Sequence, residues 1–231
     1  MPKTEQTPAI RFAGFTDPWE QRKLGDMGSI AMNRRIFKDQ TLETGDVPFY
    51  KIGTFGGDPD AFISCELFEE YKSKYSYPNI GDILISASGS IGRTVEYVGN
   101  DEYFQDSNIV WLQHDQRLDN SFLKHFYTVV KWRGLEGSTI KRLYNKNILD
   151  TEINVPSPSE QKVIGSFFTH IDHLITLHQR MPCYPKFIGT GRTKKCRIKE
   201  GVQSGFANII RDGLRSTKKG LSGKSPCRSI A

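Results

Sequence analysis

The stretch 155–180 (VPSPSEQKVIGSFFTHIDHLITLHQR) constrains the fold of this chain most strongly. Ser157 is a good N-cap, Pro158 suits the first helical position, and Glu160 can close a capping box back onto Ser157. Apolar residues then recur three and four positions apart, which predicts a helix with a contact stripe for a second helix. The predicted stripe consists of Ile164, Phe167, Phe168, Ile171, Leu174 and Ile175.

The same period is also typical of an ordinary amphipathic helix that packs on its own domain, so periodicity alone leaves both interpretations open. A chain of 231 residues can hold one sizeable domain and an appendage. We therefore expect four parts along the chain: a loose N-terminal leader over 1–18, a main domain over 19–156, the helix over 157–180, and a basic, disordered tail over 181–231.

The composition indicates a soluble globular protein. Hydrophobic residues make up 37% of the chain and the mean hydropathy is −0.49. No run approaches the roughly 18 apolar residues of a membrane span, and the first residues lack the apolar core of a signal peptide, so we expect a cytoplasmic protein that does not enter the membrane. The four cysteines show no paired CxxC spacing, and we expect neither a metal nor a cofactor.

The positive net charge of +6 invites a nucleic-acid interpretation, but it is unevenly distributed. Residues 1–180 carry 20 Lys and Arg against 24 Asp and Glu, whereas residues 181–231 carry 12 against 2. A DNA site on the main domain would therefore have to be a local basic patch, because the domain as a whole offers no attractive net charge.

The main domain mixes strand and helix signals without regular βαβ alternation, which predicts an α+β fold. The stretch 81–99 (GDILISASGSIGRTVEYVG) predicts a hairpin, because two alternating segments flank a small-residue turn over 88–92. The other predicted elements are strands over 47–55, 108–112 and 152–155 and helices over 65–75 and 121–133.

No catalytic motif emerges from the sequence. The glycines of GSIG are not followed by the lysine of a phosphate-binding loop. Asp60, Glu70 and Lys72 resemble the acid-acid-lysine set of metal-dependent nucleases, but Glu70 and Lys72 lie two residues apart on a predicted helix and so face different directions. We therefore reject this nuclease hypothesis and expect a protein that is not an enzyme.

Polar and basic side chains that the predicted turns present are the remaining candidates for a binding site. Arg and Lys can hold phosphates or read guanine, and Asn and Ser can contact bases or backbone. The alternative is a set of ordinary solvated loops. The candidate DNA-contacting residues are Lys51, Thr54, Ser88, Ser90, Arg93, Lys141, Arg142, Asn145 and Lys146.

The order of the segments adds a resemblance to a known family. The succession WEQRKLGD, PFYKIGTF, GDILISASGSIGR, FQDSNIVWL, GSTIKRLYNKNILDTEINVP and SPSEQKVIGSFFTHIDHLITLHQR resembles one half of the specificity subunit of a type I restriction-modification system. The resemblance covers residues 19–180. It implies a target recognition domain followed by a coiled-coil spacer helix, and sequence-specific binding to double-stranded DNA.

The resemblance also implies partners. Methyltransferase subunits would bind around the spacer helix, and a separate motor-nuclease subunit would cut the DNA. The family's second recognition domain has no counterpart here, so we expect a truncated half-subunit whose helix pairs with a second copy. The tail would be an out-of-frame or foreign continuation. The alternative is a remnant that binds the methyltransferase but does not recognise DNA.

Overall fold

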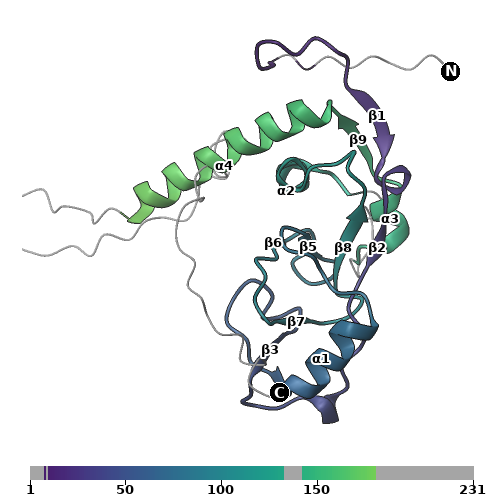
Figure 1. Ribbon diagram of the computed structural model, residues 1–231, viewed down its shortest axis with the longest axis vertical. Coiled ribbons are helices and arrows are strands. Elements are labelled where there is room, and N and C mark those ends of the chain that lie inside the picture. The colour runs from purple at the N-terminus through teal and green to yellow at the C-terminus, as the bar shows by residue number, and fades with distance from the viewer. Residues whose placement is uncertain (1–7, 9, 133–141, 181–231) are drawn as a thin grey trace, which may run out of the picture. The chain divides into compact units, whose positions relative to one another are not determined.

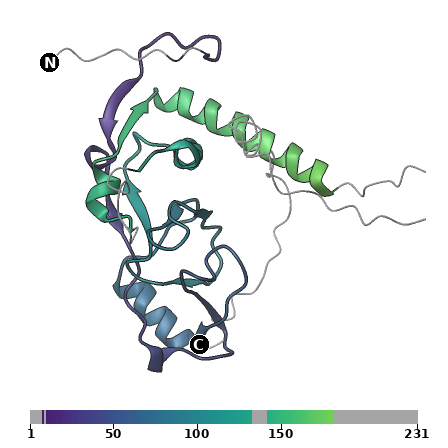
Figure 2. The same cartoon turned by 180° about the vertical axis from the view of Figure 1, so that it is seen from behind.

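The computed structural model describes residues 8, 10–132 and 142–180. The described residues up to Gly165 belong to one compact unit, and Ser166–Arg180 belongs to a second, which is considered by itself. Figures 1 and 2 show the first unit from opposite sides, with strands β1 and β9 near one end and helix α1 near the other. No helix within the described part of the chain has the length and apolar character needed to cross a membrane.

A four-stranded antiparallel sheet forms the middle of the first unit. Its order is β2 (Gly28–Ala31), β8 (Ile109–His114), β5 (Ile83–Ser86) and β6 (Thr94–Glu96). All four residues of β5 are buried, as expected for a short apolar run in a central strand. Leu84 of β5 pairs with Trp111 of β8, and both side chains are fully buried in the core. The predicted hairpin is confirmed.

A smaller three-stranded sheet packs with an aromatic core near α1 (Cys65–Lys74). Its order is β4 (Phe62–Ile63), β3 (Val47–Tyr50) and β7 (Tyr103–Phe104), and the β3–β7 pair is parallel. Helix α1 begins where predicted, because the Ser64 hydroxyl accepts a hydrogen bond from Leu67 N at 3.3 Å. The Phe68 ring lies against Tyr77 with centroids 5.7 Å apart.

The two ends of the domain meet in a separate antiparallel pair. Strand β1 (Glu20–Lys23) pairs with β9 (Glu152–Val155), and the two lie side by side in Figure 1. Short helices η1 (Leu24–Asp26), η2 (Lys38–Gln40) and α3 (Asn145–Leu149) connect the strands, and α2 (Asn120–Val129) follows β8. Because β9 ends at Val155, the pair determines where the next helix starts.

Helix α4 (Pro158–Arg180) begins at the predicted position. The Ser157 hydroxyl accepts a hydrogen bond from Glu160 N at 3.4 Å. The reciprocal half of the predicted capping box is not made. The Glu160 carboxylate is fully buried and instead accepts two hydrogen bonds from Arg11, from Nε and Nη2, each at 2.7 Å. Arg11 lies in the segment predicted to be a loose leader, and this ion pair fastens it to α4.

Gln161 and Gly165 fasten the same helix to its neighbours. The fully buried Gln161 amide accepts from Asp119 N at 2.8 Å and donates to the carbonyls of Arg117 at 2.8 Å and Pro156 at 2.9 Å. A side chain on Gly165 would overlap with Ser121 of α2, so only glycine allows this approach. We call Arg11, Glu160, Gln161 and Gly165 the helix anchor.

The predicted α+β fold is confirmed, with corrections at two elements. The strand predicted over 47–55 ends at Tyr50, because Thr54 bonds to Lys51 through both backbone and side chain and turns the chain. Helix α2 ends at Val129 rather than at Arg133, and Val130 is already extended. Strands β1, β2, β4 and β7 were not predicted; β4 and β7 have only two residues each, too few for an alternating pattern.

Candidate DNA-recognition surface

Four segments that are distant in sequence are joined by hydrogen bonds at one place. They are the turn after β3 (51–57), the hairpin tip between β5 and β6 (87–93), the turn between β7 and β8 (105–108) and the start of α3 (142–146). We call these four segments the loop cluster. Because the first three segments connect strands of the buried sheets, the core determines where those loops begin and end.

The turn 105–108 is the centre of the loop cluster. Gln105 N donates to Tyr50 O at 2.9 Å, and the Gln105 side-chain oxygen accepts from Ile52 N at 2.9 Å. Asn108 O accepts from Ala87 N at 2.7 Å, and its side-chain oxygen accepts from the Ser88 hydroxyl at 2.8 Å. This turn therefore joins the segment after β3 to the hairpin tip.

The other two joints use basic side chains that the sequence had singled out. Arg93 donates from Nη2 to Gly56 O at 3.2 Å, and Arg142 donates from Nη2 to Ser107 O at 2.9 Å. Leu143 N donates to Ala87 O at 2.8 Å, which brings the start of α3 to the hairpin. Ser107 has a positive φ of 54°, an unusual conformation that points to a tightly determined turn.

Several candidate residues hold the loop cluster together as well as facing solvent. Ser88 is half-buried and bonded to Asn108, and Thr54 is bonded within its own turn. The backbone oxygen of Ser90 accepts from the Ser86 hydroxyl, while the Ser90 side chain is exposed. Lys51 pairs with Asp60 at 2.9 Å. These contacts bring the candidates together but occupy part of their hydrogen-bonding capacity.

The remaining candidates are more exposed. Asn145 and Lys146 are exposed in the first turn of α3, so they lie on a helix rather than on the predicted turn. Lys141 lies outside the described residues. Sequence reasoning missed the turn 105–108, although Asp106, Ser107 and Asn108 in a row are a turn signal at the start of the strand predicted over 108–112.

The electrostatics of the surrounding aromatic core are ordinary. Burial raises the pKa of the Tyr50 phenol next to the loop cluster and also that of Tyr77 deeper in the core. Both phenols therefore stay neutral at physiological pH.

The rejected nuclease residues do not converge in the structure. Asp60 pairs with Lys51, Glu70 pairs with Lys74 at 2.9 Å, and Lys72 pairs with Asp101 at 3.3 Å. Within the described ranges, no group of three or more His, Cys, Asp or Glu residues is placed to hold a metal ion.

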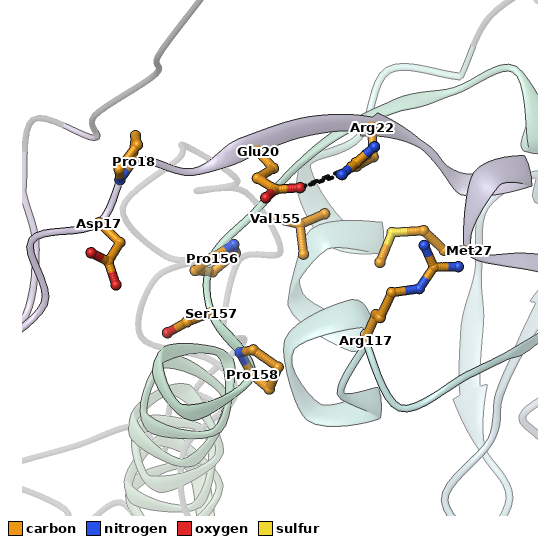
Figure 3. A pocket seen from close by; sticks show the side chains of 10 residues that line it. All are labelled: Asp17, Pro18, Glu20, Arg22, Met27, Arg117, Val155, Pro156, Ser157 and Pro158. Atoms are coloured by element: carbon orange, nitrogen blue, oxygen red, sulfur yellow. Dashed lines mark hydrogen bonds and ion pairs between the residues drawn. The ribbon is translucent and has the colours of Figure 1, made fainter. Parts of the chain in front are cut away.

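A pocket of about 440 Å³ lies beside the start of α4. None of the residues that line it belongs to the loop cluster. Its cations are already paired: Arg22 with Glu20 at 2.5 Å, as Figure 3 shows, and Arg117 with Asp115 at 2.7 Å. The Arg117 side chain lowers the pKa of Asp115 by hydrogen bonding to it. The lining residues are Asp17, Pro18, Glu20, Arg22, Met27, Arg117, Val155, Pro156, Ser157 and Pro158.

The stripe predicted on the spacer helix is partly available. Ile164 is only 9% exposed and belongs to the core of the first unit. Phe167 is 43% exposed and Leu174 is 59% exposed, while Phe168, Ile171 and Ile175 are half-buried. Two further apolar residues that were not predicted, Val163 and Leu177, are also exposed, at 39% and 50%.

The fold and the loop cluster together define an α+β domain in which polar side chains converge on loops that the core positions. Residues 16–182 match the family model of the type I restriction modification DNA specificity domain. This match covers more than half of the chain, and the chain therefore belongs to that family.

Known relatives agree with this assignment. A protein of Haemophilus influenzae that carries the name of a type I restriction enzyme specificity subunit is 56% identical over 153 residues, covering 66% of this chain and 40% of that protein. The chain therefore spans less than half the length of this relative.

Two solved structures share the fold. The crystal structure of the type I restriction-modification system S subunit from M. genitalium gives a TM-score of 0.51 at 18% identity, over 75% of this chain and 44% of that one. A structure from a study of complex assembly and conformational transition of the type I R-M system gives 0.50 at 18% identity, over 76% and 41%.

Proposed function

We propose that this chain is a sequence-specific DNA-binding module of a type I restriction-modification complex and is itself not an enzyme. Residues 19–156 form the target recognition domain, and residues 157–180 form the spacer helix. Double-stranded DNA is the ligand, and methyltransferase and motor-nuclease subunits are the protein partners. The observation that carries this proposal is the family match over 16–182, on a fold whose polar loops converge.

The loop cluster is the proposed DNA surface. Arg93 on the hairpin tip and Arg142 and Lys146 in the segment 142–146 supply positive charge to the loop cluster, which suits contact with DNA phosphates. The candidates Lys51, Thr54, Ser88, Ser90, Lys141 and Asn145 complete the proposed contact set.

The experiment is footprinting of random-sequence duplexes with the full chain, alone and with the methyltransferase subunit of the same system. We expect protection or enrichment of one DNA motif when the methyltransferase is present. Binding to the methyltransferase with equal affinity for every DNA sequence would contradict the proposal and favour a protein that only binds this subunit.

We further propose that α4 pairs with α4 of a second copy. The exposed residues Val163, Phe167, Leu174 and Leu177 are spaced by four, seven and three positions, which is the seam of a coiled coil with His170 in the remaining place. The 23 residues of α4 correspond to about 35 Å of helix at 1.5 Å per residue, long enough for antiparallel pairing. Two identical halves would read an interrupted palindrome.

Light scattering tests the pairing. The unmodified chain is expected to be a dimer and Phe167→Asp a monomer, because the new carboxylate would be buried in the seam. Gln179→Asp adds the same charge at an exposed position off the seam and is expected to remain a dimer. If the unmodified chain is monomeric at a protein concentration of roughly tens of micromolar, the pairing is ruled out, because an exposed apolar seam should drive association at that concentration.

A further inference from the structure

The side-chain amide of Gln105 is held in one orientation by the backbone. Its oxygen accepts a hydrogen bond from Ile52 N at 2.9 Å. A backbone N–H is only a donor, so the amide group facing it must be the oxygen and not the NH2. The backbone of Gln105 is fixed as well, because Gln105 N donates to Tyr50 O. Both ends of this residue are therefore tied to the segment that leaves β3.

The other half of the same amide is left for a ligand. Among the described residues, no partner for Gln105 Nε2 is present, and this atom is not enclosed in the core. Gln105 lies two residues before Ser107, to which Arg142 donates, and its partner Ile52 lies four residues before Gly56, to which Arg93 donates. Gln105 therefore belongs to the same loop cluster as the two basic side chains proposed to contact DNA phosphates.

An amide whose oxygen is already used recognises a different base from a free one. A free glutamine pairs with adenine through both of its groups, because adenine offers N7 as an acceptor and N6 as a donor. The bond from Ile52 N occupies one of the two lone pairs of the oxygen, and the NH2 donor has no partner among the described residues. Guanine presents two adjacent major-groove acceptors, N7 and O6, whereas adenine and thymine present one each, at N7 and O4, and cytosine presents a donor at N4. A lone NH2 donor therefore suits guanine best.

We propose that Gln105 is a specificity-determining residue that reads guanine at one position of the DNA target through its Nε2 donor, with its oxygen locked to Ile52 N. This inference rests on the proposed function, since it requires the loop cluster to face the major groove. It assigns a reading role to a residue in the turn 105–108, outside the contact set taken from the sequence.

The first test replaces the outward-facing donor with an acceptor and keeps the hydrogen bond from Ile52 N. In Gln105→Glu one carboxylate oxygen can still accept from Ile52 N, while the other becomes an acceptor that suits cytosine N4. Motifs are selected from random duplexes by the full chain with the methyltransferase subunit. We expect one position to change from guanine to cytosine with a preference on the order of tenfold, and the other positions to stay the same.

Gln116→Glu is the matched control. Gln116 is exposed on the turn after β8, about 20 Å along the strand from the turn before it, and the change in charge is the same. Its motif is expected to be unchanged. If the unmodified chain selects no motif, the proposed function fails. If it selects a motif that Gln105→Glu leaves unaltered, the reading role of Gln105 is overturned and the proposed function stands.

A second measurement does not depend on the folding of Gln105→Glu. The unmodified chain is titrated with its selected duplex, in which one guanine at a time is replaced by 7-deazaguanine, which lacks the N7 acceptor. One position should lose roughly fivefold to tenfold in affinity, and Gln105→Met should bind the two duplexes equally. The inference is overturned if Gln105→Met loses as much affinity for the 7-deazaguanine duplex as the unmodified chain does. It is also overturned if no 7-deazaguanine substitution weakens binding by the unmodified chain.

Discussion

The helix anchor and the loop cluster use the same kinds of polar side chain in opposite surroundings. In the anchor, Glu160 and Gln161 are fully buried, and each is hydrogen-bonded within the domain. In the loop cluster, Arg93 is exposed and Arg142 half-buried, and each side chain donates a hydrogen bond to a backbone carbonyl. Burial thus separates polar groups that hold the fold from polar groups that keep donors available for a ligand.

Hydrogen bonding in the helix anchor also changes the pKa of Arg11. The Glu160 side chain raises the pKa of Arg11 by accepting its hydrogen bonds. The ion pair joins residues 149 positions apart and fixes the segment before β1 to the first turn of α4.

Gln161→Leu should have the largest effect. The change leaves Asp119 N and the carbonyls of Arg117 and Pro156 without their partner in a buried place, at about 1 kcal/mol or more for each group, or roughly 3 kcal/mol in total. Chemical denaturation measures the loss. Gln179→Leu makes the same change at an exposed position of α4 and should leave the unfolding free energy nearly unaltered. Equal effects in both variants would show that burial does not distinguish them.

Gly165→Ala should follow. An added Cβ would lie 2.6 Å from Ser121 Cβ and 3.0 Å from Phe122 N, so α4 or α2 has to shift, which costs about 1–3 kcal/mol. Ser166→Ala, at the next and exposed position, is the control and should be close to neutral. Thermal unfolding compares the two. A Gly165→Ala variant as stable as the unmodified chain would mean that the two helices do not approach so closely.

Arg142→Ala should reduce stability by an intermediate amount and should also weaken DNA binding, because this side chain both holds a loop and carries positive charge. Loss of the bond to Ser107 O should lower the unfolding free energy by about 1 kcal/mol, since the site is half-exposed. Binding to the selected DNA should weaken as well. Arg142→Lys keeps the positive charge but not the guanidinium geometry. It should therefore restore DNA affinity to a greater extent than it restores the unfolding free energy. Isothermal titration and thermal unfolding separate these effects, and unchanged values for both would remove Arg142 from either role.

Lys146→Ala should have the smallest effect on stability, within about 0.5 kcal/mol, because the side chain is exposed in the first turn of α3. Its effect should appear in binding, where loss of one phosphate contact reduces the salt slope by about one. Lys38→Ala, exposed on η2 outside the loop cluster, is the control. Both variants keep the basic residues 181–231, so the non-specific attraction of these residues to DNA contributes equally to the two salt slopes. The same slope in both variants would exclude Lys146 from the DNA surface.

The local elements with strong signals were predictable. The start of α4, the hairpin of β5 and β6, and the start of α1 follow from capping residues and alternation, which act over a few neighbouring residues. The basic candidates Arg93 and Arg142 were singled out because their chemistry suits DNA at any position on a surface, and their contact with DNA stays a prediction. The order of segments along the chain carried the family resemblance.

Other features depended on contacts between residues far apart in the chain. Glu160 has the spacing of a capping box, but Arg11 offers its buried carboxylate two charged donors, a stronger set of hydrogen bonds than a single backbone N–H. Likewise Gln105 lies in an unremarkable turn signal, and only the approach of Ile52 determines which half of its amide stays free. Sequence alone determined the elements with strong local signals, whereas the short strands β1, β2, β4 and β7 became apparent only from their pairing in the structure. Tertiary structure decided which polar groups are used up and which are left to bind, because a buried hydrogen bond needs a partner that the chain brings back from a distant position.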